Sequence, residues 1–126
     1  MSLSCLLDGN WREYSGGSRP GTNRIRFQEL ADGRVLIELF YVFDWNTGET
    51  QSHGFILPRE TFESLEQQLS QSGLARIAVQ DEIQDFVFEC RMAAERLEFR
   101  VRGSGQPYLP TPTSIMMTDY ATVYNR

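Results

Sequence analysis

Lysine is absent from the 126 residues of this chain, and all 12 basic residues are arginine. A chain without lysine can form no Schiff base and has no P-loop lysine, so both chemistries are excluded. Histidine occurs once, as His53, which leaves no histidine pair for a metal ion. No G-x-S-x-G elbow is present. We therefore expect no enzyme, no cofactor and no metal site. An enzyme with His53 as its base is the last alternative, and a surface strand histidine is the simpler interpretation.

Cysteine and long apolar runs are also scarce. The two cysteines, Cys5 and Cys90, are too few for a disulfide framework, and both alternate with apolar neighbours. We expect both to face the core as reduced thiols. No stretch reaches the length of a membrane span, and the N-terminus lacks the pattern of a signal peptide. These absences predict a cytoplasmic protein that makes no contact with a membrane.

Positive charge is in deficit. The 17 acidic residues outnumber the 12 basic ones, and the formal net charge is −5. An acidic surface repels phosphate backbones, so nucleic-acid binding is disfavoured, whereas a basic protein partner would be attracted. Modest negative charge is also a common route to solubility, and this second interpretation stays open.

What is present is a core-forming composition in a pattern dominated by strands. Hydrophobic residues make up 40% and aromatic residues 12% of the chain, which suits one domain at 1–126. Residues 24–57 and 74–124 have strand patterns almost throughout, and a single amphipathic helical pattern at 58–72 separates them. The spacing predicts an α+β fold, with a mainly antiparallel, strongly curved sheet or incomplete barrel of about seven or eight strands. The helix is expected to pack on the sheet through an apolar stripe. The stripe consists of Phe62, Leu65 and Leu69.

One strand, at 35–45, is apolar on both faces. A strand of this kind is usually central in its sheet and covered on both sides. The sequence leaves three coverings open for the second face, namely the helix, a second protomer or an apolar cavity. Unprotected edges on so long a strand also favour a homodimer.

Turn-forming residues divide the rest of the chain into hairpins. Residues 8–10 predict a turn within a short strand pair at 3–14. Strands at 84–92 and 95–102 are expected to pair about Ala93-Ala94. The outward positions of the second of these strands are Glu98, Arg100 and Arg102.

Aromatic side chains are densest near the end of the long strand, and this group is the first candidate site for a partner or ligand. Tyr41 and Trp45 have polar tips and lie close to the following turn, where exposed aromatic residues can anchor a partner. Phe43 and Asp44 lie between them, and strand pairing across the turn brings His53 near. The alternative interpretation assigns most of these side chains to the core.

The one basic patch that the sequence predicts surrounds a glycine-rich loop at 15–23. Arg19 lies in this loop and Arg12, Arg24 and Arg26 flank it, and arginines together with backbone N–H groups can hold an anion. Trp11, which precedes Arg12, is a further candidate binding residue. The glycines match no nucleotide-binding pattern, so a simple hairpin connection is the alternative. An acidic stretch at 81–89 is typical of a solvated face, with docking of a basic partner as its functional interpretation.

Two resemblances suggest functions. Gly9-Asn10-Trp11, followed by many strands, is similar to the G-x-W opening of lipocalin-like (calycin) barrels, which implies a carrier of a small apolar ligand. The helix at 58–72 departs from that family. Size, acidic charge and the single helix resemble those of small acidic immunity proteins of bacterial toxin systems. We therefore expect a non-enzymatic protein-binding or inhibitor module, with a small-molecule carrier as the alternative.

Overall fold

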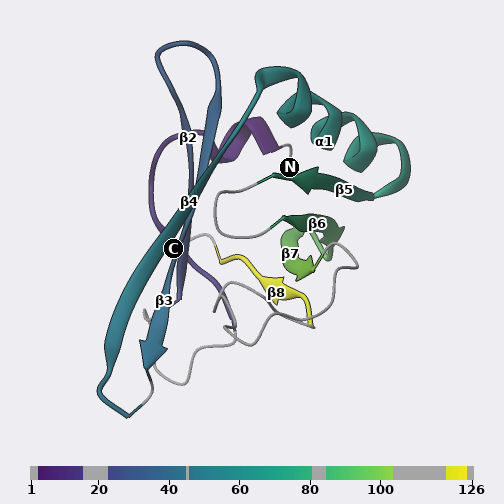
Figure 1. Cartoon of the computed structure of the whole chain (residues 1–126). Coiled ribbons are helices and arrows are strands. Elements are labelled where there is room, and N and C mark those ends of the chain that lie inside the picture. The colour runs from purple at the N-terminus through teal and green to yellow at the C-terminus, as the bar shows by residue number, and fades with distance from the viewer. Residues whose placement is uncertain (1–2, 16–22, 45, 81–84, 104–118, 125–126) are drawn as a thin grey trace.

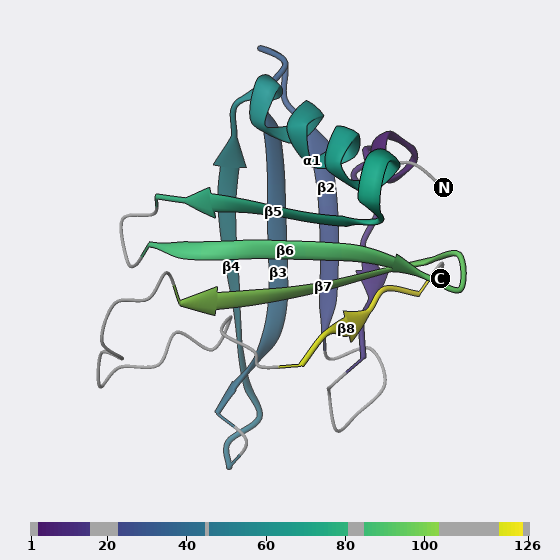
Figure 2. The same cartoon turned by 90° about the vertical axis from the view of Figure 1, so that its right-hand side faces the viewer.

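The computed structural model describes residues 3–15, 23–44, 46–80, 85–103 and 119–124, which form two antiparallel sheets and one α-helix. The sheets stack face to face, and the strands of one cross those of the other (Figure 1, Figure 2). The first sheet has the strand order β1 (Arg12–Glu13), β2 (Arg24–Glu29), β3 (Val35–Asp44) and β4 (Glu49–Leu57). The second sheet has the order β5 (Leu74–Val79), β6 (Phe86–Ala93), β7 (Arg96–Gly103) and β8 (Ala121–Thr122).

Alternation of apolar and polar residues explains how each sheet buries one face. In β2, Ile25 and Phe27 are buried and their neighbours are not. In β7, Leu97, Phe99 and Val101 are buried, and the residues between them face outward. The alternation predicted from the sequence is confirmed in both strands.

The core lies between the sheets and contains aromatic rings from both of them. Phe55 of β4 contacts Phe86 and Phe88 of β6, with ring centroids 5.1 and 5.6 Å apart. Phe88 stacks on Phe99 of β7 at 5.9 Å, and Tyr14 meets Phe99 edge to face at 5.1 Å. Rings from both sheets therefore meet across the interior.

The helix α1 (Arg59–Ser72) lies in the same layer as the second sheet, beside β5 and over the first sheet (Figure 2). Phe62 and Leu65 are fully buried, and Leu69 packs against the core, so the predicted helix and its apolar stripe are confirmed. The helix ends at Gly73, whose left-handed φ of 73° lets its N–H donate to the Leu69 carbonyl at 2.8 Å. Within the described residues, no helix has the length and apolar character that crossing a membrane requires.

The two faces of β3 have different surroundings. Ile37 and Leu39 are fully buried between the sheets. Leu36, Phe40 and Val42 are only half-buried on the outer face. The helix does not cover that outer face, because α1 lies in the other layer (Figure 1).

The α+β class is confirmed, but the expected strongly curved sheet or incomplete barrel is wrong, since neither sheet is closed or strongly curled. The strands divide into two sheets because α1 leads the chain from β4 to β5, and these two strands do not pair. On the opposite side of the molecule, a bridge between Tyr14 and Val123 joins the two sheets.

The N-terminal segment departs from the expected strand pair. Leu3–Leu6 forms a short 3-10 helix, and Arg12–Glu13 alone becomes a strand and pairs with β2. Cys5 is exposed rather than buried, because the helical turn directs its two leucines to the core. Cys90 in β6 is buried, as predicted.

Candidate functional site

The predicted aromatic site at the end of β3 is assigned only in part. Tyr41 is buried between the sheets, and burial raises the pKa of its hydroxyl. The side chains of Phe43 and Asp44, and all of Trp45, lie outside the described residues. The one side chain of this group that the structure describes therefore belongs to the core and not to an exposed surface.

His53 lies on the inner face of β4. The register places it opposite Leu39, which is fully buried, and His53 itself is half-buried. Phe55 and Leu57 alternate with His53 on this face and are buried. The strand alternation therefore directs the side chain of His53 to the inner face of the sheet, where it is half-buried.

Three of the predicted site residues meet on the outer face of the first sheet. The guanidinium carbon of Arg26 lies 4.7 Å from the centroid of the Trp11 ring, and that of Arg24 lies 4.5 Å from the centroid of Phe40. Arg26 also pairs with Glu38, its neighbour across the β2–β3 register, at 2.5 Å. Stacking and ion pairing hold these cations flat on the sheet. We call Trp11, Arg24, Arg26 and Phe40 the outer aromatic surface.

The rest of the predicted basic patch does not add to this surface. Arg12 is bound to Asp8, with 2.8 Å between Nη2 and Oδ2. The hydrogen bond from Arg12 holds the pKa of Asp8 well below its usual range. Residues 16–22 of the glycine-rich loop lie outside the described residues.

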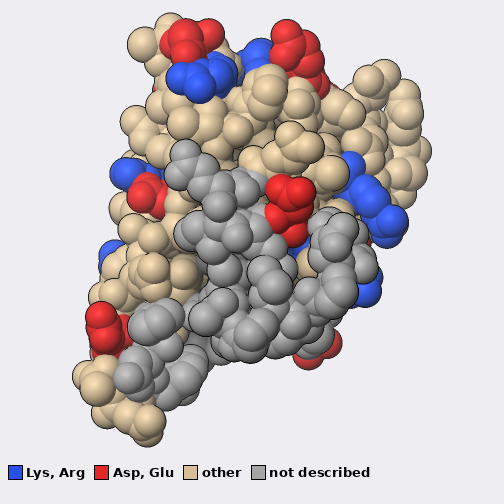
Figure 3. All heavy atoms as spheres, in the orientation of Figure 1, with Lys and Arg blue, Asp and Glu red and all other residues tan. Residues whose placement is uncertain are grey.

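The outer face of the second sheet is basic, although the protein as a whole is acidic. Every charged residue of β5, β6 and β7 alternates with buried residues and lies on this outer face. The three strands contribute five arginines and two glutamates. In the orientation of Figure 1 this face is turned to the right, where Figure 3 shows blue atoms along the margin below the helix. We call the five arginines the arginine face: Arg76, Arg91, Arg96, Arg100 and Arg102.

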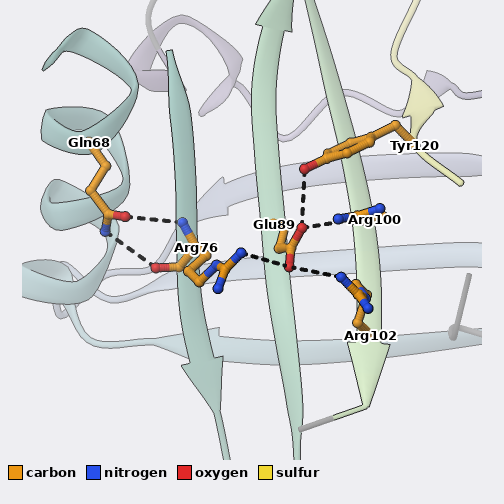
Figure 4. Close-up of polar contacts among 6 residues, drawn as sticks. All are labelled: Gln68, Arg76, Glu89, Arg100, Arg102 and Tyr120. Atoms are coloured by element: carbon orange, nitrogen blue, oxygen red, sulfur yellow. Dashed lines mark hydrogen bonds and ion pairs between the residues drawn. The ribbon is translucent and has the colours of Figure 1, made fainter. Parts of the chain in front are cut away.

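A buried carboxylate, Glu89, lies at the centre of the arginine face and is only 3% exposed (Figure 4). Its Oε2 accepts hydrogen bonds from Arg100 Nε at 2.8 Å and from the Tyr120 hydroxyl at 3.1 Å. Its Oε1 faces Arg76 at 3.6 Å and Arg102 at 3.8 Å. These longer contacts are ion pairs rather than hydrogen bonds. One carboxylate thus orients guanidinium groups from both neighbouring strands.

The ring of Tyr120 constrains the same face from the β8 side. The guanidinium carbons of Arg91 and Arg100 lie 3.9 and 4.4 Å from its centroid. Arg91 is also bound to Glu98, with 2.7 Å between Nε and Oε1. A guanidinium group that is stacked on a ring has a fixed plane, and its edge can still donate to a partner. Tyr120 therefore holds the Arg91 and Arg100 side chains in place on this face.

At neutral pH, Glu89 and Tyr120 have the protonation states that their hydrogen bond requires. Burial by itself raises the pKa of Glu89, but the hydrogen bonds from Arg100 and Tyr120 and the nearby arginine charges outweigh burial and lower that pKa. Burial and the hydrogen bond to Glu89 raise the pKa of Tyr120. Glu89 is therefore ionised while Tyr120 is protonated and donates to it.

Arg76 and Arg102 have the N–H donors that are most available to a partner. Their side chains are 64% and 53% exposed. Because their contacts with Glu89 are longer than hydrogen bonds, Glu89 leaves most of their N–H donors unused. A guanidinium group in this state can bind a carboxylate or phosphate group through two parallel hydrogen bonds.

Sequence reasoning misses this surface because its residues come from separate strands. The acidic stretch at 81–89 predicts a solvated face, yet Glu89 is buried, so that interpretation is wrong for this residue. The register places Arg76 and Arg100 on either side of Glu89. The alternation of arginine and glutamate at the outward positions of β7 is the one local pattern that points to the surface.

The described residues contain no group of three or more histidine, cysteine, aspartate or glutamate side chains that could hold a metal ion. No protein-family model, no curated protein and no solved structure matches this chain.

Proposed function

We propose that this protein is a non-enzymatic protein-binding module and that its arginine face binds an acidic segment of a partner protein. The observation that carries the proposal is the placement of five arginines and two glutamates on one sheet face. Arginine and tyrosine are enriched among the residues that dominate binding energy at interfaces. Glu89 and Tyr120 order this face in advance, which reduces the entropy lost on binding.

A protein segment fits this surface better than a nucleic acid does. Nucleic acids carry negative charge along their whole length. The net charge of −5 includes the positive excess of the arginine face, so the remainder of the molecule is more acidic still and would repel a long polyanion. A short acidic segment needs only a local basic surface.

The sign of charge expected for the partner differs between the net charge of the whole chain and the local charge of the arginine face. The net charge of the whole chain favours a basic partner, and that expectation stays a prediction for the remaining surface. The local charge of the arginine face favours an acidic one. At contact the local charge dominates, because salt confines electrostatic interactions to roughly 8 Å at physiological ionic strength.

Inhibition of the partner, as in an immunity-like module, is one concrete form of this role. The carrier alternative depends on a barrel that encloses a cavity, whereas here neither sheet closes and aromatic rings from both sheets meet in the interior. The enzyme alternative gains no support from the register, which places His53 beside buried Leu39. The arginine face therefore favours the protein-binding role over both alternatives.

Binding of a labelled acidic peptide tests the proposal. We expect a fluorescein-labelled peptide of glutamate and glycine to bind the protein and to bind the double variant Arg76→Gln/Arg102→Gln at least about tenfold more weakly. Hydrogen bonds to charged groups contribute roughly 1.5–3 kcal/mol each, so loss of even one reaches that factor. Both side chains are more than half exposed, and their replacement leaves the core intact. Fluorescence anisotropy at low and physiological salt measures the affinity.

The matched control is Arg34→Gln, which removes a comparably exposed guanidinium group that is paired with Asp32. We expect this variant to bind the peptide as the unchanged protein does. An equal loss of affinity in the control would contradict the assignment of the site. Failure of the unchanged protein to bind the peptide at low salt would contradict the proposed function.

A further inference from the structure

The two sheets have four outer strands, and two of these are joined to each other. β1 and β8 meet at the bridge between Tyr14 and Val123, and Ser15 N–H donates to the Thr122 carbonyl at 3.0 Å. The other two outer strands are β4 and β5. An outer strand exposes backbone donors and acceptors with which another strand can pair.

The chain itself protects the edge of β5. Gln68 of α1 donates from Nε2 to the Arg76 carbonyl at 3.3 Å, and its Oε1 accepts from Arg76 N–H at 3.1 Å (Figure 4). The hydroxyl of Ser72 donates to the Leu74 carbonyl at 3.0 Å. The Gln68 amide therefore imitates a neighbouring strand and occupies the edge that β5 would otherwise expose.

Apart from the register shift at Val42/Asp44 near its start, the edge of β4 has none of the usual protections among the described residues. The strand has nine residues, and the eight pairs from Val35↔Leu57 to Val42↔Thr50 run in one unbroken register with β3. After Glu49 it contains no acidic residue, no arginine and no proline, and lysine is absent from the whole chain. Natural edge strands commonly use such residues to prevent pairing. In the part of the chain that the structure describes, no strand lies on the other side of β4.

We propose that β4 pairs with β4 of a second copy of this chain, antiparallel and about a two-fold axis, so that the two first sheets become one continuous sheet. A two-fold interface brings each surface against itself, and it is therefore favourable only where like charges do not meet. In a register centred on His53, Thr50 faces Ile56 and Glu49 faces Leu57. The acidic residue of the strand thus never faces its own copy, although the protein carries a net charge of −5.

The exposed side chains of β4 are compatible with pairing to β4 of a second copy. Ile56 is 45% exposed, and it gains Thr50 of the second copy as a cross-strand neighbour. Ser52 faces Gly54 of the second copy, where no side chain obstructs the approach. The arginine face lies on the other sheet, so this proposal and the proposed function can fail separately.

The oligomeric state and the exchange of β4 amides test the proposal together. We expect light scattering after gel filtration to show a dimer, and the Ser52→Lys variant to dissociate at least about tenfold more readily. The introduced lysines lie diagonally across the two-fold axis in the dimer, where like charges repel. The matched control is Ala78→Lys, another exposed position, on β5, where Gln68 binds the backbone of Arg76, and its dimer should persist.

Hydrogen exchange of the unchanged protein provides a second measurement that needs no variant. We expect exchange of amides at 49–57 to slow as the protein concentration rises, while exchange at 74–79 stays constant. A monomer at millimolar concentration would overturn the proposal. A dimer that resists Ser52→Lys, or one whose β4 amides exchange equally fast at all concentrations, would overturn it as well, because its interface would lie elsewhere.

Discussion

Glu89 is the residue on which the arginine face depends. It is a charged side chain that is buried, at 3% exposure, and it is surrounded by positive charge. Arg76 and Arg100 are its direct neighbours across the strands, so without a carboxylate between them their charges would repel. A glutamate within an acidic stretch of sequence therefore acts as the internal counter-ion of a basic surface.

We expect Glu89→Gln to lower the free energy of unfolding by about 1–3 kcal/mol at neutral pH, because it leaves guanidinium groups without a compensating charge. The folded protein lowers the pKa of Glu89 below its ordinary value of 4.5. The stabilisation is therefore present above pH 4.5 and is lost as the pH falls from there through the lowered pKa. Urea unfolding at a series of pH values should show the difference between the two proteins shrinking in acid.

Glu63→Gln is the control for this prediction. It removes a carboxylate that is 62% exposed and pairs with Arg59 at 3.4 Å. An exposed pair of this kind contributes little, and we expect a change of at most about 0.5 kcal/mol. A difference between Glu89→Gln and the unchanged protein that stays constant down to low pH would mean that the carboxylate is not the stabilising group.

At the scale of elements, the hairpin between β6 and β7 is present as predicted, but its turn is shifted and has an unusual conformation. The sequence predicts a turn at Ala93-Ala94, whereas Ala93 pairs with Arg96 and the turn lies one residue later. Its two central residues, Ala94 and Glu95, have positive φ angles of 51° and 65°. Such a turn normally uses asparagine and glycine at these positions. The end of the arginine face is therefore held by a backbone conformation that both side chains disfavour.

Because only some positions in this turn have positive φ, we expect glycine to change the free energy of unfolding in opposite directions at two nearby positions. We expect Glu95→Gly to raise the free energy of unfolding by roughly 0.5–1 kcal/mol, because glycine adopts positive φ without steric conflict. Ala93→Gly, at a position without positive φ, should lower it by roughly 0.5–1 kcal/mol. Thermal and urea unfolding measure both. Destabilisation by both variants would argue against strain at Glu95.

Local patterns predict the elements of this protein better than its surfaces. The helix at 58–72 and the alternation in β7 depend on neighbours in sequence, and both are confirmed. Trp11 and Arg26 come from opposite sides of one loop, and their side chains are in contact. The arginine face depends on strand register, which brings together residues that are far apart in sequence, and no local pattern specifies which strands are neighbours.

At the scale of the whole molecule, the same alternating strands suit a barrel and a pair of stacked sheets equally well. The choice depends on whether β4 and β5 pair, and α1 lies between them in the chain and beside β5 in space. The first sheet is held to the second by side chains of the core, among them Phe55, and by the bridge at Tyr14. This construction implies that the two sheets are stable only together.

Two side chains can report separately on the two sheets. Trp11 contacts Arg26 on the first sheet, so its fluorescence, measured with Trp45 replaced by phenylalanine, follows the opening of that sheet. Cys90 lies in β6 of the second sheet, and burial raises the pKa of its thiol to about 12. The thiolate is the reactive form, so Cys90 becomes reactive only when the second sheet opens. Replacement of the exposed Cys5 by serine leaves Cys90 as the one thiol to be labelled.

Phe55→Ala tests whether the sheets unfold as one unit. Phe55 extends from the first sheet onto Phe86 and Phe88 of the second, so its removal should lower the free energy of unfolding by about 3–5 kcal/mol. Leu74→Ala, at a leucine of β5 that is 45% exposed, should lower it by less than about 1 kcal/mol. In each variant we expect fluorescence and Cys90 labelling to change at the same urea concentration. Labelling that precedes the fluorescence change would show that the second sheet opens alone, and the rings between the sheets would then not be what makes the fold cooperative.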